Sequence, residues 1–96
     1  MPSMKITVVV TRKDLFEGCP DMPRSCPLAL AVGRRIGKRP LDDIEVRVGN
    51  IVIDLDRGDK KYRAHHTKRS AAFVRAFDSF GKVWPSRYIL TFKELS

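Results

Sequence analysis

The sequence predicts a small α+β domain in which two helices cover one face of a mostly antiparallel sheet. Two kinds of pattern lead to this fold class. Residues 44–55 alternate between apolar and polar side chains around the pair Gly49-Asn50, which predicts a β-hairpin. Two other segments repeat apolar side chains at helical spacing, which predicts two amphipathic helices. A chain of 96 residues is long enough for one such domain.

The first element is a strand over Lys5–Thr11, where β-branched side chains dominate. Its valines at 8–10 follow one another without alternation, so we expect this strand to be covered on both faces. Residues 12–24 contain Gly18, Pro20 and Pro23 and predict a long loop.

A helix is expected after this loop, with Ser25 as its N-cap and Pro27 in its first turn, where a missing N–H is tolerated. Gly37 and Pro40 are typical of a helix end. The apolar stripe of this helix consists of residues four apart, namely Leu28, Val32 and Ile36.

In the hairpin, Gly49-Asn50 is expected to form the turn. The register then pairs Val48 with Ile51, Val46 with Ile53 and Ile44 with Leu55, all on one face. A third strand is expected over Lys61–His65, with Tyr62 and Ala64 on one side, after a turn at residues 57–60.

The second helix is expected to begin at Thr67 or Ser70 and to end at Gly81. Its apolar stripe consists of Phe73, Phe77 and Phe80. A last strand over Tyr88–Phe92 completes the order β-α-β-β-(β)-α-β. We expect a ferredoxin-like sandwich or a variant of it, with the first and last strands adjacent near the middle of the sheet.

The composition favours an intracellular protein. The longest apolar runs are far too short for a membrane span or a signal peptide, so we expect a cytoplasmic protein that does not bind membranes. In that compartment Cys19 and Cys26 are expected to be reduced. The net charge of +8 and the pI near 10.0 make phosphate-bearing partners plausible.

The charge is concentrated in one stretch. Residues 57–75 contain seven Lys and Arg and one acidic residue, a net +6 of the chain's +8. The stretch predicts a phosphate-binding surface that includes the start of the second helix, and its alternative is an ordinary solvated basic loop. The candidate ligand-binding residues in it are Lys60, Lys61, Arg63, His65, His66, Lys68 and Arg69.

Further candidates lie outside this stretch. Arg34 and Arg35, with Lys38 and Arg39, form a second basic cluster, although cations at a helix C-terminus also complement the helix dipole without any ligand. Trp84 is the best candidate to stack on a base, and its alternative is an anchor over the sheet edge.

The sequence resembles a family of short uncharacterised proteins encoded by bacteriophages and prophages. The resemblance is carried by 4–8 (Met-Lys-Ile-Thr-Val), 26–31 (Cys-Pro-Leu-Ala-Leu-Ala), 73–78 (Phe-Val-Arg-Ala-Phe-Asp) and a Gly-Lys-Val segment at 81–83. Family members often have a close Cys-x-x-Cys-Pro, whereas six residues separate the two cysteines here. The resemblance implies a phage accessory protein that acts against host defences or on nucleic acid.

Metal binding and catalysis are weaker hypotheses than phosphate binding. Cys19, Cys26, His65 and His66 offer four zinc-ligating atoms at poor spacing, and Cys26 is also typical of a buried small apolar residue, so we expect no metal or cofactor. Asp54 and Asp56 point away from the apolar face, either as a metal or proton-sharing pair or as the solvent side of an edge strand. Residues 57–59 (Arg-Gly-Asp) are expected to be a turn.

Together these observations predict a non-enzymatic, homo-oligomeric protein that binds a phosphate-bearing ligand. The first hypothesis is that it sequesters a nucleotide signal of host immunity. The alternatives are a nucleic-acid-binding protein and an inhibitor that uses its basic face on an acidic host protein.

Overall fold

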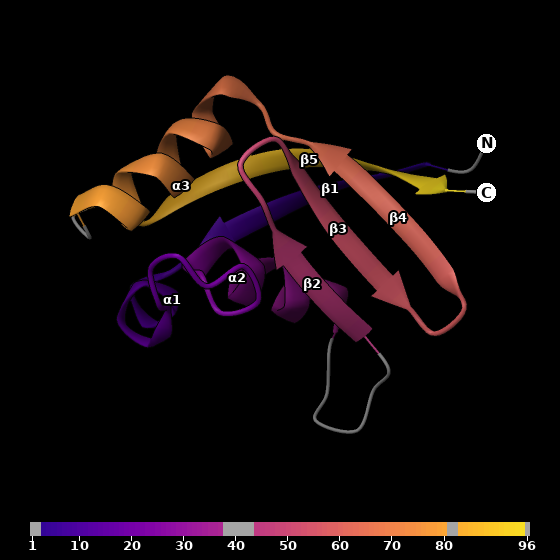
Figure 1. Cartoon of the computed structure of the whole chain (residues 1–96), viewed down its shortest axis with the longest axis horizontal. Coiled ribbons are helices and arrows are strands. Elements are labelled where there is room, and N and C mark those ends of the chain that lie inside the picture. Colours follow the sequence, from indigo (N-terminus) through magenta and orange to yellow (C-terminus); the bar gives the residue numbers. More distant parts are fainter. Residues whose placement is uncertain (1–2, 38–43, 81–82, 96) are drawn as a thin grey trace.

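The computed structural model describes residues 3–37, 44–80 and 83–95 and confirms the α+β class. Its elements are β1 (Ser3–Val10), α1 (Arg12–Glu17), α2 (Pro27–Ile36), β2 (Ile44–Val48), β3 (Val52–Arg57), β4 (Lys60–His65), α3 (Lys68–Phe80) and β5 (Ser86–Leu95). The strands form one antiparallel sheet in the order β1-β5-β4-β3-β2 (Figure 1). The predicted Lys38, Arg39, Pro40, Gly81 and Lys82, and the side chain of Phe80, lie outside the described residues.

The core lies between the helices and one face of this sheet. Each strand buries alternate side chains on that face, including Val8, Leu55 and Phe92, which are fully buried. Leu28 and Val32 of α2 and Phe73 and Val74 of α3 belong to the same core, and Phe77 is also buried. On the opposite face, which we call the open face, the outward side chains of β1, β4 and β5 are exposed and those of β2 and β3 are half-buried.

The first strand differs from its prediction. Its burial alternates, and Val9 is 47% exposed, so β1 is covered on one face only. β1 pairs with β5 as expected, but it is an edge strand and does not lie in the middle of the sheet. Consecutive valines do not establish that a strand is covered on both faces, because an edge strand tolerates a β-branched side chain on its solvent face.

Two details around the first helices also differ. Residues 12–17 of the predicted loop form α1, because Thr11 and Asp14 make a reciprocal capping box. The N-cap of α2 is Cys26 and not Ser25: the Cys26 Sγ accepts a hydrogen bond from the Ala29 N–H at 3.4 Å. Gly37 ends α2 in the left-handed conformation, as predicted.

The hairpin forms, but its register is shifted by two residues. Val48 pairs with Ile53, and the Gly49 N–H donates to the Val52 carbonyl at 2.9 Å. The two turn residues are therefore Asn50 and Ile51, and Ile51 is 73% exposed. His66 explains the difference, because its N–H donates to the Ile51 carbonyl at 3.0 Å and its ring contacts the Gly49 carbonyl. Asp54 and Asp56 face solvent as expected, but β3 is an inner strand and not an edge.

Candidate anion-binding cleft between α3 and β5

The start of α3 is fixed by a reciprocal pair of hydrogen bonds. The Ser70 N–H donates to the Thr67 Oγ1 at 3.1 Å, and the Thr67 N–H donates to the Ser70 Oγ at 3.0 Å. This is the geometry of a capping box, with serine in the position that glutamate usually occupies. The first N–H groups of a helix have no intrahelical acceptor, so Lys68 and Arg69 bring both backbone donors and side-chain cations to this end of α3.

An open cleft of about 700 Å³ lies where the start of α3 meets the ends of β1 and β5. Its cations are Lys68, Arg69 and Arg87, and no carboxylate in residues 3–37, 44–80 or 83–95 lines it. Among the described residues none of these three cations takes part in an ion pair. The remaining lining residues are Val9, Val10, Thr67, Pro85, Ser86, Tyr88 and Ile89.

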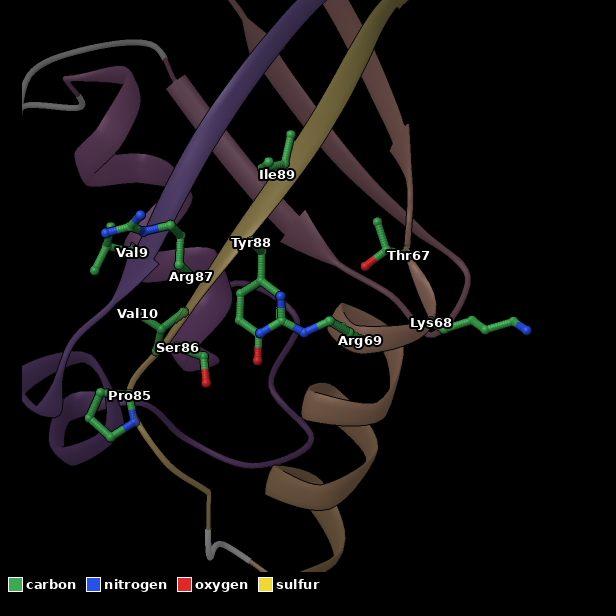
Figure 2. A pocket seen from close by; sticks show the side chains of 10 residues that line it. All are labelled: Val9, Val10, Thr67, Lys68, Arg69, Pro85, Ser86, Arg87, Tyr88 and Ile89. Carbon is green, nitrogen blue, oxygen red and sulfur yellow. The ribbon is translucent and has the colours of Figure 1, made fainter.

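The Arg69 side chain lies over the ring of Tyr88, which itself packs against Phe73. Its guanidinium carbon lies 5.4 Å from the centroid of the Tyr88 ring, and that ring contacts Phe73 with centroids 5.5 Å apart. Figure 2 shows Arg69 reaching from α3 to Tyr88, Lys68 extended away from it, and Arg87 beside Val9. The three cations therefore flank the cleft from two elements, α3 and β5, and do not meet at one point.

A second hollow, of about 410 Å³, adjoins the first. Thr67 and Lys68 line both, and Arg75 adds a cation from the next turns of α3. Arg75 and Arg87 were not predicted as site residues. Arg87 stands apart from any basic run in the sequence, and only the pairing of β5 with β1 and its closeness to α3 bring it to the cleft.

The structure separates the predicted ligand residues into several groups. Lys68 and Arg69 line the cleft, and Trp84, 83% exposed, directly precedes its lining residue Pro85. Lys60 and Lys61 lie at the far end of β4, where Lys61 is opposite Leu95. The others that are exposed without lining the cleft are His65 on β4 and Arg35 on α2.

Three predicted residues have partners within the protein. Arg63 donates to Asp54 at 2.7 Å across the open sheet face. Arg34 donates to both carboxylate oxygens of Asp14, at 2.6 and 2.8 Å, and to the Val9 carbonyl at 2.8 Å. Arg34 thus joins α2 to α1 and β1, which is a structural role.

The third is His66. Its Nε2 lies 2.8 Å from the Gly49 carbonyl and its Nδ1 lies 2.8 Å from the Ser70 Oγ. A carbonyl only accepts, so Nε2 carries the proton and Nδ1 of the neutral ring accepts from the Ser70 hydroxyl. Burial lowers the pKa of His66, although the hydrogen bond to Gly49 acts in the opposite direction. His66 therefore links the hairpin tip to α3 as a neutral ring.

The cysteines and carboxylates form no metal-binding cluster within the described ranges. Cys26 is buried, as its small apolar character suggested, and burial raises the pKa of its thiol. Cys19 is exposed, and both cysteines are free. Asp56 lies 3.4 Å from Arg47, so both outward aspartates of β3 are ion-paired.

Comparisons with known proteins assign no family to this chain, so the function is inferred from the geometry of the site. No family model, curated protein or solved structure matches the chain. Within the described residues, no helix has the length and apolar character needed to cross a membrane.

Proposed function

We propose that this protein binds a phosphate-bearing ligand of nucleotide type in the cleft between α3 and β5, and that it does so without catalysing a reaction. One observation carries the proposal: three cations from two elements flank this cleft, and no carboxylate of the described residues lines it. A lining with three cations and no carboxylate from the described ranges creates a local positive potential.

The individual groups suit a phosphate. Arg69 offers a planar fork of N–H donors that matches two phosphate oxygens, and the Tyr88 ring under it reduces its freedom before a ligand arrives. The backbone donors at the start of α3 add to this field. The Ser86 hydroxyl donates to the Trp84 carbonyl at 2.9 Å, so it shapes the rim and is not counted among the phosphate donors.

The size and walls of the cleft suit the rest of a nucleotide. Small-molecule sites usually measure about 300–1,000 Å³, and the cleft falls inside this range at about 700 Å³. Trp84 stands exposed beside it and provides a flat apolar surface on which a base can stack. In this proposal Lys68, Arg69 and Arg87 bind the phosphate, and Trp84 contacts the base.

The biological setting is proposed on the resemblance to phage proteins alone. In that setting the protein is cytoplasmic and oligomeric and removes a nucleotide signal of host immunity by binding it. The alternative function, inhibition of a host protein through an acidic surface, uses the same cations. Competition between nucleotides and that acidic protein for these cations distinguishes the two functions.

Trp84 makes the proposal directly testable, because it is the only tryptophan of the chain. Its fluorescence is followed while AMP, ATP or the dinucleotide pApA is added to the wild type and to Arg69→Ala. Loss of a charge-assisted hydrogen bond costs about 1.5–3 kcal/mol, so Arg69→Ala is expected to weaken binding at least about tenfold.

Lys13→Ala is the matched control, since Lys13 is an exposed cation of α1 outside the cleft and is paired with Glu17 at 3.7 Å. It is expected to bind as the wild type does. Dissociation constants above about 1 mM for all three nucleotides would overturn the proposal, as would equal affinity of Arg69→Ala and the wild type. Native mass spectrometry of freshly purified protein adds the subunit number and the mass of any retained nucleotide.

A further inference from the structure

The open face of the sheet is divided by charge. Its carboxylates, Glu45, Asp54 and Asp56, all lie on β2 and β3. Each has an arginine partner: Arg24, Arg63 and Arg47, respectively. The outward side chains of β1, β5 and β4 include no carboxylate. One half of the face is thus internally neutralised, and the other half keeps its positive charge.

The strand register places the positive half along β5. Arg87 and Lys93 are six positions apart on this strand, so they are separated by about 20 Å at the usual rise of about 3.4 Å per residue. Lys5 lies opposite Thr91, and Lys61 lies opposite Leu95. In the described part of the chain none of these four cations has an ion-pair partner. Lys5 on β1, Lys61 on β4, and Arg87 and Lys93 on β5 thus form a positively charged strip along the open face. We call this strip the β5 track.

The β5 track is continuous with the cleft. Arg87 belongs to both, and the exposed side chains of Val9 and Ile89 lie beside it and also line the cleft. Val9 is opposite Arg87 and Ile89 is opposite Thr7, so the two apolar side chains are diagonal neighbours on the open face. Cations therefore alternate with apolar surface along the path that leads out of the cleft.

We propose that this nucleotide-type ligand is a single-stranded oligonucleotide, with one nucleotide in the cleft and the following phosphates along the β5 track. This inference rests on the proposed function and names its substrate class. A single strand exposes base faces that can lie on Val9, Ile89 and Trp84, whereas a duplex hides them. A duplex would also bring a second phosphate backbone over β2 and β3, which carry the carboxylates. The track suits on the order of four nucleotides, the low end for single-strand sites.

The test compares a fluorescein-labelled thymidylate decamer, followed by anisotropy, with unlabelled thymidine monophosphate, a thymidylate tetramer and a ten-base-pair duplex as competitors. The key variant is Lys61→Ala/Lys93→Ala, which removes two exposed cations of the β5 track that do not line the cleft. Arg69→Ala removes a cation of the cleft, and Lys13→Ala is again the control for net charge.

The wild type is expected to bind the decamer and the tetramer more tightly than the monophosphate and the duplex. For single strands the logarithm of affinity falls by about 0.7 per phosphate contact for each decade of salt. Removing two contacts is therefore expected to reduce the salt slope by about 1.4 and decamer affinity roughly twentyfold near 0.1 M salt. The double variant should bind the monophosphate within about twofold of the wild type, because its cleft is intact.

The outcomes separate the two proposals. If the monophosphate binds as tightly as the decamer, or if the double variant binds the decamer like the wild type, the β5 track is not used, although the cleft function stands. If the duplex binds as tightly as the decamer, the single-strand assignment is wrong. If neither the monophosphate nor the decamer binds, both the track and the proposed function fail.

Discussion

Replacing Asp14 by alanine is expected to destabilise the fold by about 2–3 kcal/mol without changing ligand affinity. Asp14 is 4% exposed, and its Oδ2 accepts from the Thr11 N–H at 2.8 Å to cap α1. Both of its oxygens also accept from Arg34, at 2.6 and 2.8 Å. One carboxylate therefore fixes the start of α1 and joins that helix to α2, and through Arg34 to the end of β1.

The magnitude follows from these contacts. Loss of an N-terminal cap costs about 1 kcal/mol. Hydrogen bonds to charged groups are worth about 1.5–3 kcal/mol, but the Arg34 side chain is 50% exposed, so water replaces part of what it loses and we count about 1–2 kcal/mol. For a chain of this size, the total lowers Tm by roughly 10–20 °C.

The assay is urea unfolding followed by far-ultraviolet circular dichroism, with Trp84 fluorescence used in parallel for ligand affinity. Glu17→Ala is the matched control on the same helix, since its pair with Lys13 spans 3.7 Å between exposed side chains. Its cost is expected to stay below about 0.5 kcal/mol. The reasoning is refuted if Asp14→Ala is no more costly than Glu17→Ala. It is also refuted if Arg34→Ala retains its fold and loses ligand affinity, since Arg34 would then bind ligand.

The contacts of Asp14 also predict that the free energy of unfolding decreases in acid. Burial alone would raise the pKa of Asp14, but the hydrogen bonds from Arg34 and Thr11 outweigh it and hold the pKa below its ordinary value of 3.8. The folded state then binds this proton less readily than the unfolded state does. Its stabilising contribution is complete above pH 3.8 and is lost as the pH falls through the lower, folded-state pKa. Asp14→Ala should lack this component of the pH profile.

Two further predictions concern His66 and the cysteines. Because burial lowers the pKa of His66 below 6.5, the unfolded state takes up this proton first, so the free energy of unfolding should decrease as the pH falls below 6.5. Urea unfolding from pH 8 to pH 5 should show this decrease in the wild type and in His65→Gln but not in His66→Gln, and identical profiles for all three would contradict it. Cys19→Ser/Cys26→Ser should fold, since serine keeps an acceptor at the α2 N-cap, whereas Cys26→Ala should lose about 1 kcal/mol. Loss of folding in the double variant, together with stoichiometric zinc in the wild type, would show that the cysteines hold a metal.

Much of the fold could be predicted because alternation and helical spacing are local properties. The outward direction of Asp54 and Asp56 and the burial of Leu90 on β5 follow from strand periodicity alone. Pro27 and Gly37 mark the ends of α2 through their own backbone preferences. These features need no knowledge of which elements become neighbours.

The hairpin shows where local reasoning ends. A shift of two residues leaves every side chain on its original face, so the alternation of residues 44–55 supports the predicted and the observed register equally. The contacts of His66 with Gly49 and Ile51 select the observed one, and these residues are far apart in the sequence. The choice of Cys26 over Ser25 as N-cap is likewise decided by packing, since Cys26 is buried against the core.

The sequence by itself determined that the chain is basic, that its positive charge is concentrated in residues 57–75, and which side of the hairpin strands and of the last strand faces solvent. Only the tertiary structure decided which cations are available. It pairs Arg34 with Asp14 and Arg63 with Asp54, and it brings Arg87 to Arg69 at the cleft. The physical reason is that an ion pair or a cleft depends on distances between elements that are remote in sequence. Those distances follow from the antiparallel pairing of β1 with β5 and the packing of α1 against α2, which no local pattern encodes.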